Sequence, residues 1–216
     1  MSGETTSTRI ILVRHGETCW NAEGRYQGQL DSPLTEEGRR QADAIAARLA
    51  QDRIDGLYSS DLGRARRTAE PIAAATGVPL CLDARLRERH FGLFHGQTPT
   101  ALRRHHPTDY TQFSQPDADY RVPLGESLRQ VHDRAVACLQ DLHARHAGQR
   151  LALVTHGGVL AALLKHVLGL PLAAARPFRV FNAAYNVIHH TDGRWLLEVL
   201  GDVSHLQTID GSDDVV

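Results

Sequence analysis

The chain has 216 residues, of which 42% are hydrophobic and 23% charged, a composition typical of one globular domain with a buried core. Lys and Arg number 24 against 25 Asp and Glu, so the overall charge gives no reason to expect nucleic acid or an anionic membrane as a partner. No apolar run reaches the roughly 18 residues that a membrane-spanning helix needs, which excludes an integral membrane protein of that kind.

The cysteines and residues 1–8 indicate the cellular compartment in which the protein is expected. The three cysteines are widely and irregularly spaced, so they predict neither a disulfide framework nor a zinc site and suit a reducing environment. Residues 1–8 (MSGETTST) lack the apolar core of a signal peptide. We therefore expect a cytoplasmic protein that binds neither nucleic acid nor membrane.

The first part of the chain alternates strand and helix patterns. Residues 9–13 form a continuous apolar run, typical of a strand buried on both faces. Residues 35–51 repeat apolar side chains at helical spacing, and residues 54–59 predict a second strand. A second helix is expected over residues 62–76, because Gly77 is placed to end it.

The middle of the chain is less regular. Pro71 should kink or split the second helix, and a short strand is expected over residues 80–82. Between residues 92 and 125 the periodicity disappears and Pro, Gln, Asp and His accumulate. We interpret residues 92–125 as an excursion that folds over one end of the sheet, with a helix near 99–106, and expect substrate specificity to reside there.

Regular patterns return after the excursion. Residues 126–146 predict a long amphipathic helix, and residues 151–155 predict a buried strand. Residues 158–168 are apolar nearly all round, which indicates a buried helix. A hairpin with arms at 182–190 and 194–200 completes the series.

This alternation predicts an α/β fold: a single three-layer domain over residues 9–207, with a mostly parallel central sheet and helices on both faces. The pattern shows no internal repeat and no second core. Residues 1–8 and 208–216 are expected to be disordered tails, since they are polar or rich in Asp and Gly.

Two histidines follow strands of this predicted sheet. His15 comes directly after the first strand, within Arg14-His15-Gly16, and His156 follows the strand over 151–155. Because ligands of open α/β sheets bind at the carboxyl ends of the strands, we expect both histidines in one crevice. Arg64, near the start of a helix with Ser and Asp as capping residues, should point to the same edge. Arginine matches phosphate oxygens bidentately, so the sequence predicts a phosphate cradle.

The 13 histidines make a metal site the first alternative. His143 and His146 lie three residues apart on a predicted helix, and His105-His106 and His189-His190 are adjacent pairs. None has a cysteine or carboxylate at the spacing of zinc or iron sites. We interpret these histidines as solvated surface residues, and we predict no metal and no cofactor.

Six short motifs follow one another over nearly the whole chain. They are LVRHGET (12–18), LTEEG (34–38), SSDL (59–62), LRERHFG (86–92), GES (125–127) and THGG (155–158). From residue 10 to about residue 206 the series resembles the histidine phosphatase superfamily, which includes cofactor-dependent phosphoglycerate mutases and many small phosphatases.

The resemblance implies roles for particular residues. His15 would be the nucleophile that carries a phosphoryl group, and Glu88 would be the proton donor. The groups that hold the phosphate would be Arg14, Arg64 and a protonated His156. The substrate side of the pocket would be lined by Asn21, Gln27, Gly28 and Gly157. Without the motif, Glu88 would be interpreted as an ion-pair partner of one of its two arginine neighbours.

Within the family, the motifs favour the phosphatase branch over the mutases. Mutases usually carry Tyr where this chain has Phe91 and Asn where it has Gly158, and the basic pair Arg103-Arg104 lacks the mutase context. We predict a phosphatase acting on a small phosphorylated metabolite, and we consider a homodimer as its assembly. The alternatives are a phosphoglycerate mutase and a catalytically inactive phosphate- or phosphopeptide-binding module. The substrate, and the contribution of His90 and His95 to specificity, stay open.

Overall fold

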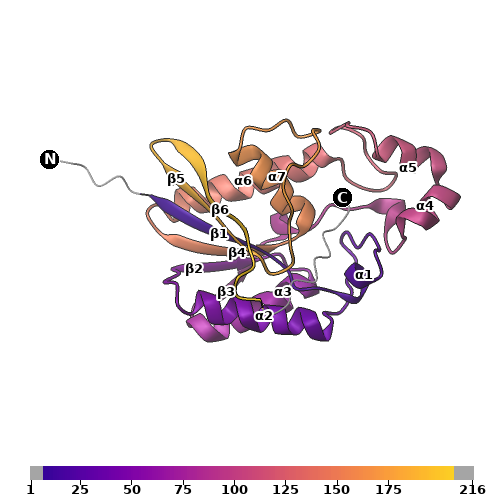
Figure 1. The fold of residues 1–216 in the computed structure, drawn as a ribbon. Helices are drawn as coiled ribbons and strands as arrows, with labels where there is room; N and C mark the ends of the chain where they lie inside the picture. The colour runs from indigo at the N-terminus through magenta and orange to yellow at the C-terminus, as the bar shows by residue number, and fades with distance from the viewer. Residues whose placement is uncertain (1–6, 207–216) are drawn as a thin grey trace.

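The computed structural model describes residues 7–206 (Figure 1). The tail predicted over 208–216 lies outside the described residues, as does most of the tail predicted over 1–8. Thr8 corrects that second prediction, because it is fully buried and begins the first strand. Its backbone pairs with His190, and its hydroxyl accepts a hydrogen bond from the Gly148 N–H at 3.0 Å.

The elements follow the predicted alternation. The strands are β1 (Thr8–Arg14), β2 (Gly56–Ser59), β3 (Leu80–Leu82), β4 (Arg150–Thr155), β5 (Tyr185–Thr191) and β6 (Arg194–Asp202). The helices are α1 (Cys19–Ala22), α2 (Glu36–Leu49), α3 (Gly63–Thr76), α4 (Pro99–His105), α5 (Pro107–Phe113), α6 (Leu128–Arg145) and α7 (Gly157–Val167). Short 3-10 turns lie at Ala84–Leu86 and Gly92–Phe94.

The six strands form one sheet in the order β3-β2-β4-β1-β5-β6. The first four are parallel, and β5 and β6 are antiparallel to their neighbours, so the prediction of a mostly parallel sheet is confirmed. In the β1–β4 register Arg14 faces Thr155, and the His15 N–H donates to the Thr155 carbonyl at 2.9 Å. The residues that follow these two strands therefore emerge side by side.

The predicted three layers are also confirmed. Figure 1 shows α2 and α3 below the sheet and α6 and α7 above it. Strand β1 serves both cores: Ile10 and Leu12 pack with α6 and α7, whereas Ile11 and Val13 pack with α2 and α3. All four side chains are buried, which explains why this strand has no polar alternation.

Helix α3 runs unbroken through Pro71, so the predicted split is wrong. A proline removes one backbone hydrogen bond, but α3 buries Ala65, Ala69 and Ile72 against the sheet. Packing of an apolar face is the main source of helix stability in proteins, and here it outweighs the lost bond.

The excursion packs on a small buried cluster that is separate from the two cores flanking the sheet. Tyr26 and Phe91 of this cluster precede the excursion, and Phe94, Leu102 and Val122 lie within it. Helices α4 and α5 pack around this cluster, beyond the carboxyl ends of the parallel strands (Figure 1). Sequence periodicity gave no sign of α5, because the helix is short and buries none of its residues fully.

Several histidines interpreted as solvated are packed against other rings. The His143 and His190 centroids lie 4.1 Å apart, and Trp195 closes the cluster. His146 bonds the Tyr58 hydroxyl at 2.7 Å.

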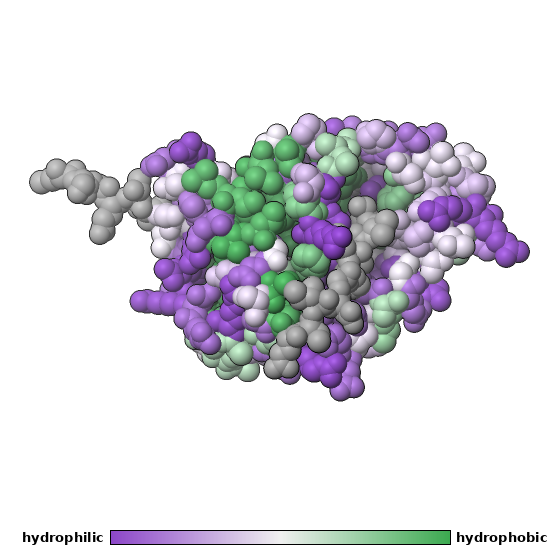
Figure 2. Space-filling model, viewed as in Figure 1, coloured by the Kyte–Doolittle hydropathy of each residue, from purple (hydrophilic) through white to green (hydrophobic). Residues whose placement is uncertain are grey.

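Figure 2 shows apolar surface over the neighbouring β5–β6 hairpin. None of the helices within residues 7–206 is both long and apolar enough to cross a membrane.

Candidate active site

His15 lies at the carboxyl end of β1 and is buried. Its Nδ1 is 2.8 Å from the Gly16 carbonyl, and its Nε2 is 3.2 Å from Nε of Arg64. A carbonyl can only accept and a guanidinium can only donate, so these two contacts assign the proton to Nδ1 and leave the lone pair on Nε2. The ring is therefore held as a neutral imidazole in one tautomer.

Arg64 is almost fully buried near the start of α3, and its guanidinium is held from several sides. One Nη donates to the Gly28 carbonyl at 2.7 Å, and the other donates to the Leu30 carbonyl at 2.8 Å and to Asp31 at 3.2 Å. With Nε directed at His15, the cation sits where the sequence predicted it.

The cap of α3 differs from the expectation of a local Ser or Asp. The N-cap residue is Leu62, which makes no side-chain cap. Asp31, from a preceding loop, instead accepts hydrogen bonds from the N–H groups of Gly63 and Arg64. Asp31 thus holds both the backbone and the guanidinium of Arg64, and no local sequence signal indicated it.

The segment 180–182, which lies just before strand β5, fixes Arg14 and His15. The Arg14 guanidinium is buried and donates to the Val180 carbonyl at 2.7 Å. The Asn182 side chain donates to the His15 carbonyl at 2.7 Å. Asn182 was expected to begin the hairpin strand, but β5 starts only at Tyr185. Sequence reasoning missed these anchors because they join segments more than 160 residues apart.

His156 precedes α7, and its ring lies beside that of His15 with the centroids 5.1 Å apart. Its Nε2 is 2.8 Å from Oγ of Ser60. Among residues 7–206, this nitrogen is the only acceptor for the Ser60 hydroxyl, which itself accepts from the Leu62 N–H. A hydroxyl that donates to Nε2 requires the ring proton on Nδ1. That Nδ1 is buried without a hydrogen-bond partner in the described chain.

Both histidines have pKa values well below that of a free imidazole. Burial, followed by the charges of Arg64 and Arg14, holds the pKa of His15 well below 6.5, although the Gly16 carbonyl opposes the shift. Burial and Arg64 lower the pKa of His156 in the same way. The expectation of a protonated His156 concerns the site with a phosphoryl group bound, and it stays a prediction. With its proton on Nδ1, a neutral His156 also offers a donor.

Glu88 approaches the site from the segment after the first 3-10 turn. Its Oε1 accepts from the Arg89 N–H at 2.7 Å, and its Oε2 accepts from the Gly158 N–H at 2.9 Å. A Cβ at Gly158 would lie 2.5 Å from Oε1, so this close approach requires glycine. The first turn of α7 thus holds the carboxyl group next to His156.

The alternative ion-pair interpretation of Glu88 does not match the structure. Arg87 pairs with Asp61, with Nε 2.7 Å from the carboxylate. The Arg89 guanidinium donates to backbone oxygens, including that of Glu126 at 2.9 Å. The Glu88 side chain is thus held by backbone N–H groups.

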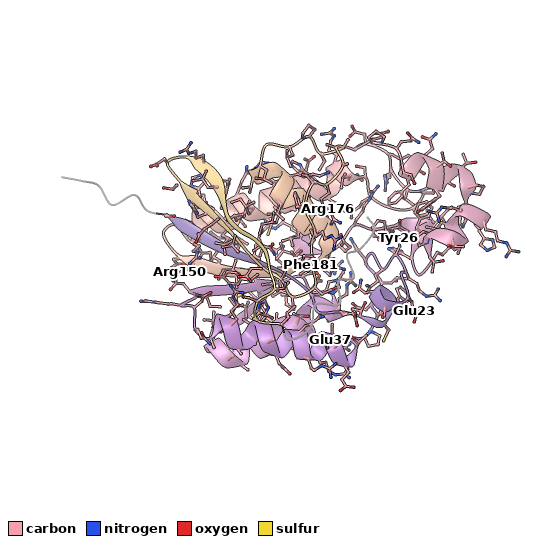
Figure 3. The ribbon with its side chains drawn as sticks, in the orientation of Figure 1. Glu23, Tyr26, Glu37, Arg150, Arg176 and Phe181 are labelled. Atoms are coloured by element: carbon pink, nitrogen blue, oxygen red, sulfur yellow. The ribbon has the colours of Figure 1, made fainter. Side chains whose placement is uncertain are left out.

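A cavity of about 370 Å³ begins at Gly157 and Gly158, next to the Glu88 carboxyl group. Figure 3 shows two of its lining residues, Tyr26 and Arg176, between α7 and the α4–α5 pair. Its aromatic side chains are Tyr26, Tyr110 and Phe113, and its charged side chains are Arg89, Asp117, Lys165 and Arg176. The excursion and α7 therefore form opposite walls of one pocket.

The residues predicted to line the substrate pocket divide into two groups. Gly157 lines the cavity. Gly28 contacts the site through its carbonyl oxygen, which accepts a hydrogen bond from Arg64. Asn21 and Gln27 are buried but do not line the cavity. The Asn21 amide oxygen instead accepts from the backbone and side chain of Thr18, which caps α1.

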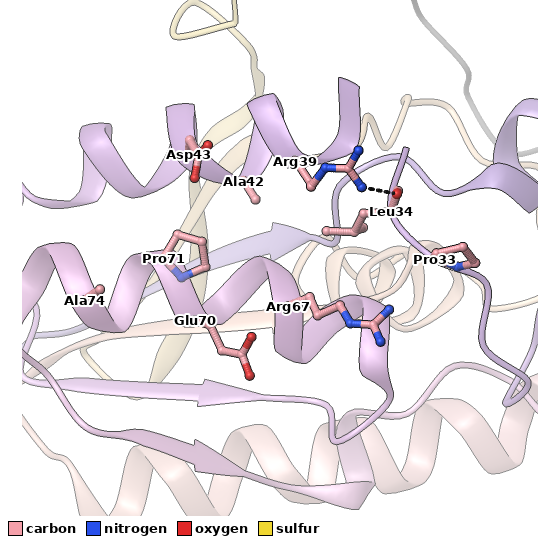
Figure 4. Close-up of a pocket in the computed structure, with 9 residues that line it drawn as sticks. All are labelled: Pro33, Leu34, Arg39, Ala42, Asp43, Arg67, Glu70, Pro71 and Ala74. Carbon is pink, nitrogen blue, oxygen red and sulfur yellow. Dashed lines mark hydrogen bonds between the residues drawn. The ribbon is translucent and has the colours of Figure 1, made fainter. Parts of the chain in front are cut away.

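A larger cavity of about 530 Å³ lies elsewhere, between α2 and α3 (Figure 4). Two arginines and two carboxylates line it, together with Pro71, and Arg39 donates to the Leu34 carbonyl at 3.0 Å. No predicted site residue is among its lining, so the larger cavity is not the candidate site.

Within residues 7–206, no three His, Cys, Asp or Glu side chains are grouped as metal ligands. The positive charge at this site is supplied by arginine side chains. Metal independence stays a prediction, to be tested by chelation.

Comparison with known proteins gives one consistent family. The model of the histidine phosphatase superfamily (branch 1) matches residues 10–203. Proteins named "probable phosphoglycerate mutase GpmB", from Shigella boydii and Escherichia coli, are 41% identical over 203 residues, which cover 92% of this chain and 94% of each relative.

Similar solved structures include proteins named as phosphatases. Bacillus stearothermophilus YhfR has a TM-score of 0.86 and 37% identity, covering 93% of this chain and 100% of that one. A mycobacterial glucosyl-3-phosphoglycerate phosphatase has a TM-score of 0.82 and 33% identity, covering 91% and 99%. The α-ribazole phosphatase of Shigella flexneri has a TM-score of 0.82 and 28% identity, covering 90% and 96%.

Proposed function

Because the chain belongs to the histidine phosphatase superfamily, we propose that it is a phosphatase that hydrolyses small-molecule phosphate monoesters through a phosphorylated His15. The observation that carries the proposal is the hydrogen bonding of the His15 ring, with Nδ1 2.8 Å from the Gly16 carbonyl and Nε2 3.2 Å from Arg64. A neutral imidazole fixed in this way presents a nucleophilic lone pair.

In the first step, the Nε2 lone pair of His15 attacks phosphorus and the bond to the alcohol oxygen breaks. The departing oxygen keeps the bonding pair and takes a proton from the Glu88 carboxyl group. Arg14, Arg64 and the Nδ1–H of His156 donate to the nonbridging oxygens, over which the charge of the transition state is spread. The alcohol leaves, and the phosphoryl group stays on His15.

In the second step, water attacks the phosphorus of phosphohistidine. The Glu88 carboxylate takes a proton from that water, and the bond between nitrogen and phosphorus breaks. Inorganic phosphate is released, while His15 and Glu88 return to their starting protonation states. Arginines supply the positive charge, so the scheme needs no metal.

The cavity of about 370 Å³ supports a leaving group larger than glycerate. Pockets that enclose drug-sized ligands begin at roughly 300 Å³, whereas a glycerate part has only a few heavy atoms. The aromatic wall of Tyr26, Tyr110 and Phe113 suits an alcohol with an apolar or planar part. The proposed substrate is therefore an organic phosphate with a substantial alcohol component.

The proposal is tested with p-nitrophenyl phosphate after exhaustive chelation. Turnover should persist, and ³²P-labelled substrate quenched in base should leave an acid-labile, base-stable label on the protein. His15→Ala should lose both label and turnover, whereas His106→Ala, a histidine outside the site, should keep both. Activity that disappears on chelation and returns with Mg²⁺ would contradict the scheme.

A phosphoglycerate mutase is the second candidate, supported by the 41% identity to proteins of that name. A mutase must grip the second charged group of a bisphosphorylated intermediate. The basic pair Arg103 and Arg104 is exposed on α4 and does not line the cavity, and Lys165 donates to the carbonyls of Leu172 and Ala174. Conversion of 3- to 2-phosphoglycerate that depends on 2,3-bisphosphoglycerate, at a rate matching hydrolysis, would favour the mutase.

An inactive binding module is the third candidate. It would bind inorganic phosphate but turn over none of a panel of phosphorylated metabolites. The same panel identifies the substrate if the protein is an enzyme.

A further inference from the structure

The loop over residues 26–30 holds Arg64 in place but contains no helix or strand. Its carbonyls at Gly28 and Leu30 accept from the Arg64 guanidinium at 2.7 and 2.8 Å. The same guanidinium donates to Nε2 of His15. The geometry of the phosphate cradle therefore depends on whatever fixes this loop.

The imidazole of His95 joins the loop to the segment that carries Glu88. Its Nε2 accepts from the backbone N–H of Phe91 at 3.1 Å and of Gln29 at 3.3 Å. Gly28 packs directly against the ring, since a Cβ there would lie 2.2 Å from Nε2. The Gln29 side chain adds a bond to the Glu88 carbonyl at 3.1 Å. One side chain thus bonds both segments next to the residue that contacts Arg64.

This arrangement requires a neutral His95, because an imidazolium has no acceptor nitrogen. Burial, followed by the charges of His90 and Arg64, lowers the pKa of His95 to about 4. The His90 ring faces it with the centroids 4.4 Å apart, and Nδ1 of His90 accepts from the Gly92 N–H. The ring therefore stays an acceptor throughout the neutral range.

We propose that His95 is a positioning residue of the phosphate site: its imidazole fixes the 26–30 loop against residues 88–92 and thereby places the Arg64 guanidinium beside His15. The inference rests on the proposed function, in which Arg64 holds the transferring phosphoryl group. His95 itself does not line the substrate cavity. Its effect on the reaction passes through Arg64.

The test compares two substitutions of similar size. His95→Leu removes the acceptor, whereas His95→Gln supplies an amide oxygen that can accept from the same N–H groups. His106→Leu serves as the matched control, since His106 lies in the excursion and makes no contact with the loop through its ring nitrogens. Each protein is assayed for kcat and KM with p-nitrophenyl phosphate, for affinity toward inorganic phosphate, and for the Arg64 Nε–H signal by ¹⁵N-arginine NMR.

His95→Leu should weaken phosphate binding and lower kcat/KM by roughly 10- to 100-fold, since small misplacements of a binding group cost that much. Its Arg64 Nε–H signal should shift or broaden. His95→Gln and His106→Leu should stay close to the wild type in all three measurements. A folded His95→Leu protein with unchanged phosphate affinity and an unchanged Arg64 signal would overturn the proposal.

If His95→Leu does not fold, a measurement on the wild-type protein tests the proposal instead. Imidazole ¹⁵N spectra at pH 7 should show an unprotonated Nε2 on His95, and a proton on that atom would overturn the proposal. If the proposed function is wrong, no substrate is turned over by the wild type. Phosphate binding and the Arg64 signal can still be measured in that case, so the role of His95 is tested separately.

Discussion

At the scale of the residue, the two histidines of the site differ in what fixes their rings. His15 is oriented by a main-chain carbonyl, that of Gly16, which no substitution removes. His156 is oriented by a side chain, the hydroxyl of Ser60. A substitution can therefore remove the group that fixes the tautomer of His156, but not the carbonyl that fixes the tautomer of His15.

Ser60→Ala should reduce kcat/KM by about 10-fold, the worth of one buried hydrogen bond. Without the hydroxyl, Nε2 of His156 has no donor, so the ring can carry its proton on the wrong nitrogen and fail to donate to phosphate. Steady-state kinetics and phosphate affinity measure the effect. Ser59→Ala is the matched control, because its buried hydroxyl donates to a backbone carbonyl. Equal losses in both variants would point to general destabilisation.

Glu88→Gln tests the proton donor, because it keeps the size and one of the two acceptor oxygens but removes the transferable proton. General acid catalysis is typically worth about 10²–10⁴-fold, so a loss of that order is expected on alkyl phosphates, whose alkoxide cannot leave unassisted. The single-turnover burst with p-nitrophenyl phosphate should suffer much less, because p-nitrophenolate is a stable anion. Equal burst losses for both substrates would leave Glu88 a positioning role only.

At the scale of the element, the start of α7 serves two purposes. It follows His156 directly, and its second residue, Gly158, binds the Glu88 carboxyl group. The closeness of helix and carboxyl group depends on the missing Cβ.

Gly158→Ala should displace the Glu88 carboxyl group while keeping the fold, because the added Cβ meets the end of a flexible side chain. A loss of roughly 10²-fold in kcat/KM on alkyl phosphates is expected. The double variant with Glu88→Gln should lose little more than Glu88→Gln alone, since both changes remove the same interaction. Additive losses would mean that Gly158 acts independently of Glu88.

Elements with strong local patterns could be predicted from the sequence. Strand β1 is apolar on both faces from Ile10 to Val13, and helix α7 is apolar nearly all round. The structure buries both in the predicted layers. Helix α5 could not be predicted, because its aromatic residues contact a small core formed by distant segments. The split predicted at Pro71 was wrong because local helix propensity carries no information about the packing that holds α3 together.

The same distinction applies to the site. His15 and His156 could be placed together because strand ends meet at one sheet edge. Asp31, Ser60 and Asn182 could not be assigned, since each acts on a residue brought near only by the fold. A single sequence contains no local signal for such partners.

At the scale of the whole molecule, the buried histidines couple the site to stability. The folded state holds the pKa values of His15 and His156 well below 6.5, whereas an unfolded chain protonates them near that value. The unfolded state then binds more protons below pH 6.5. The free energy of unfolding should therefore fall as the pH drops from about 6.5 toward the folded-state values.

Inorganic phosphate should raise the melting temperature, because only the folded site binds it. Saturation at 100 times Kd corresponds to about 2.7 kcal/mol. Denaturation from pH 8 to pH 5, with and without phosphate, measures both effects, and His15→Gln should make the pH dependence shallower. A stability that is flat between pH 7 and pH 5 would contradict the assignment of these histidines as buried and neutral.

Strand β1 lies in the middle of the sheet, although ribosomes make it before every other strand of the described chain. Its two neighbours, β4 and β5, come from residues 150–155 and 185–191. A nascent chain that ends before Arg150 thus leaves Ile10–Val13 with no partner on either edge, and pairings of such high contact order form slowly. An unpaired apolar strand is also prone to aggregation, so emerging chains should depend on chaperones until most of the protein has been made. His15, the proposed nucleophile, is therefore among the first site residues translated and among the last to be held in place.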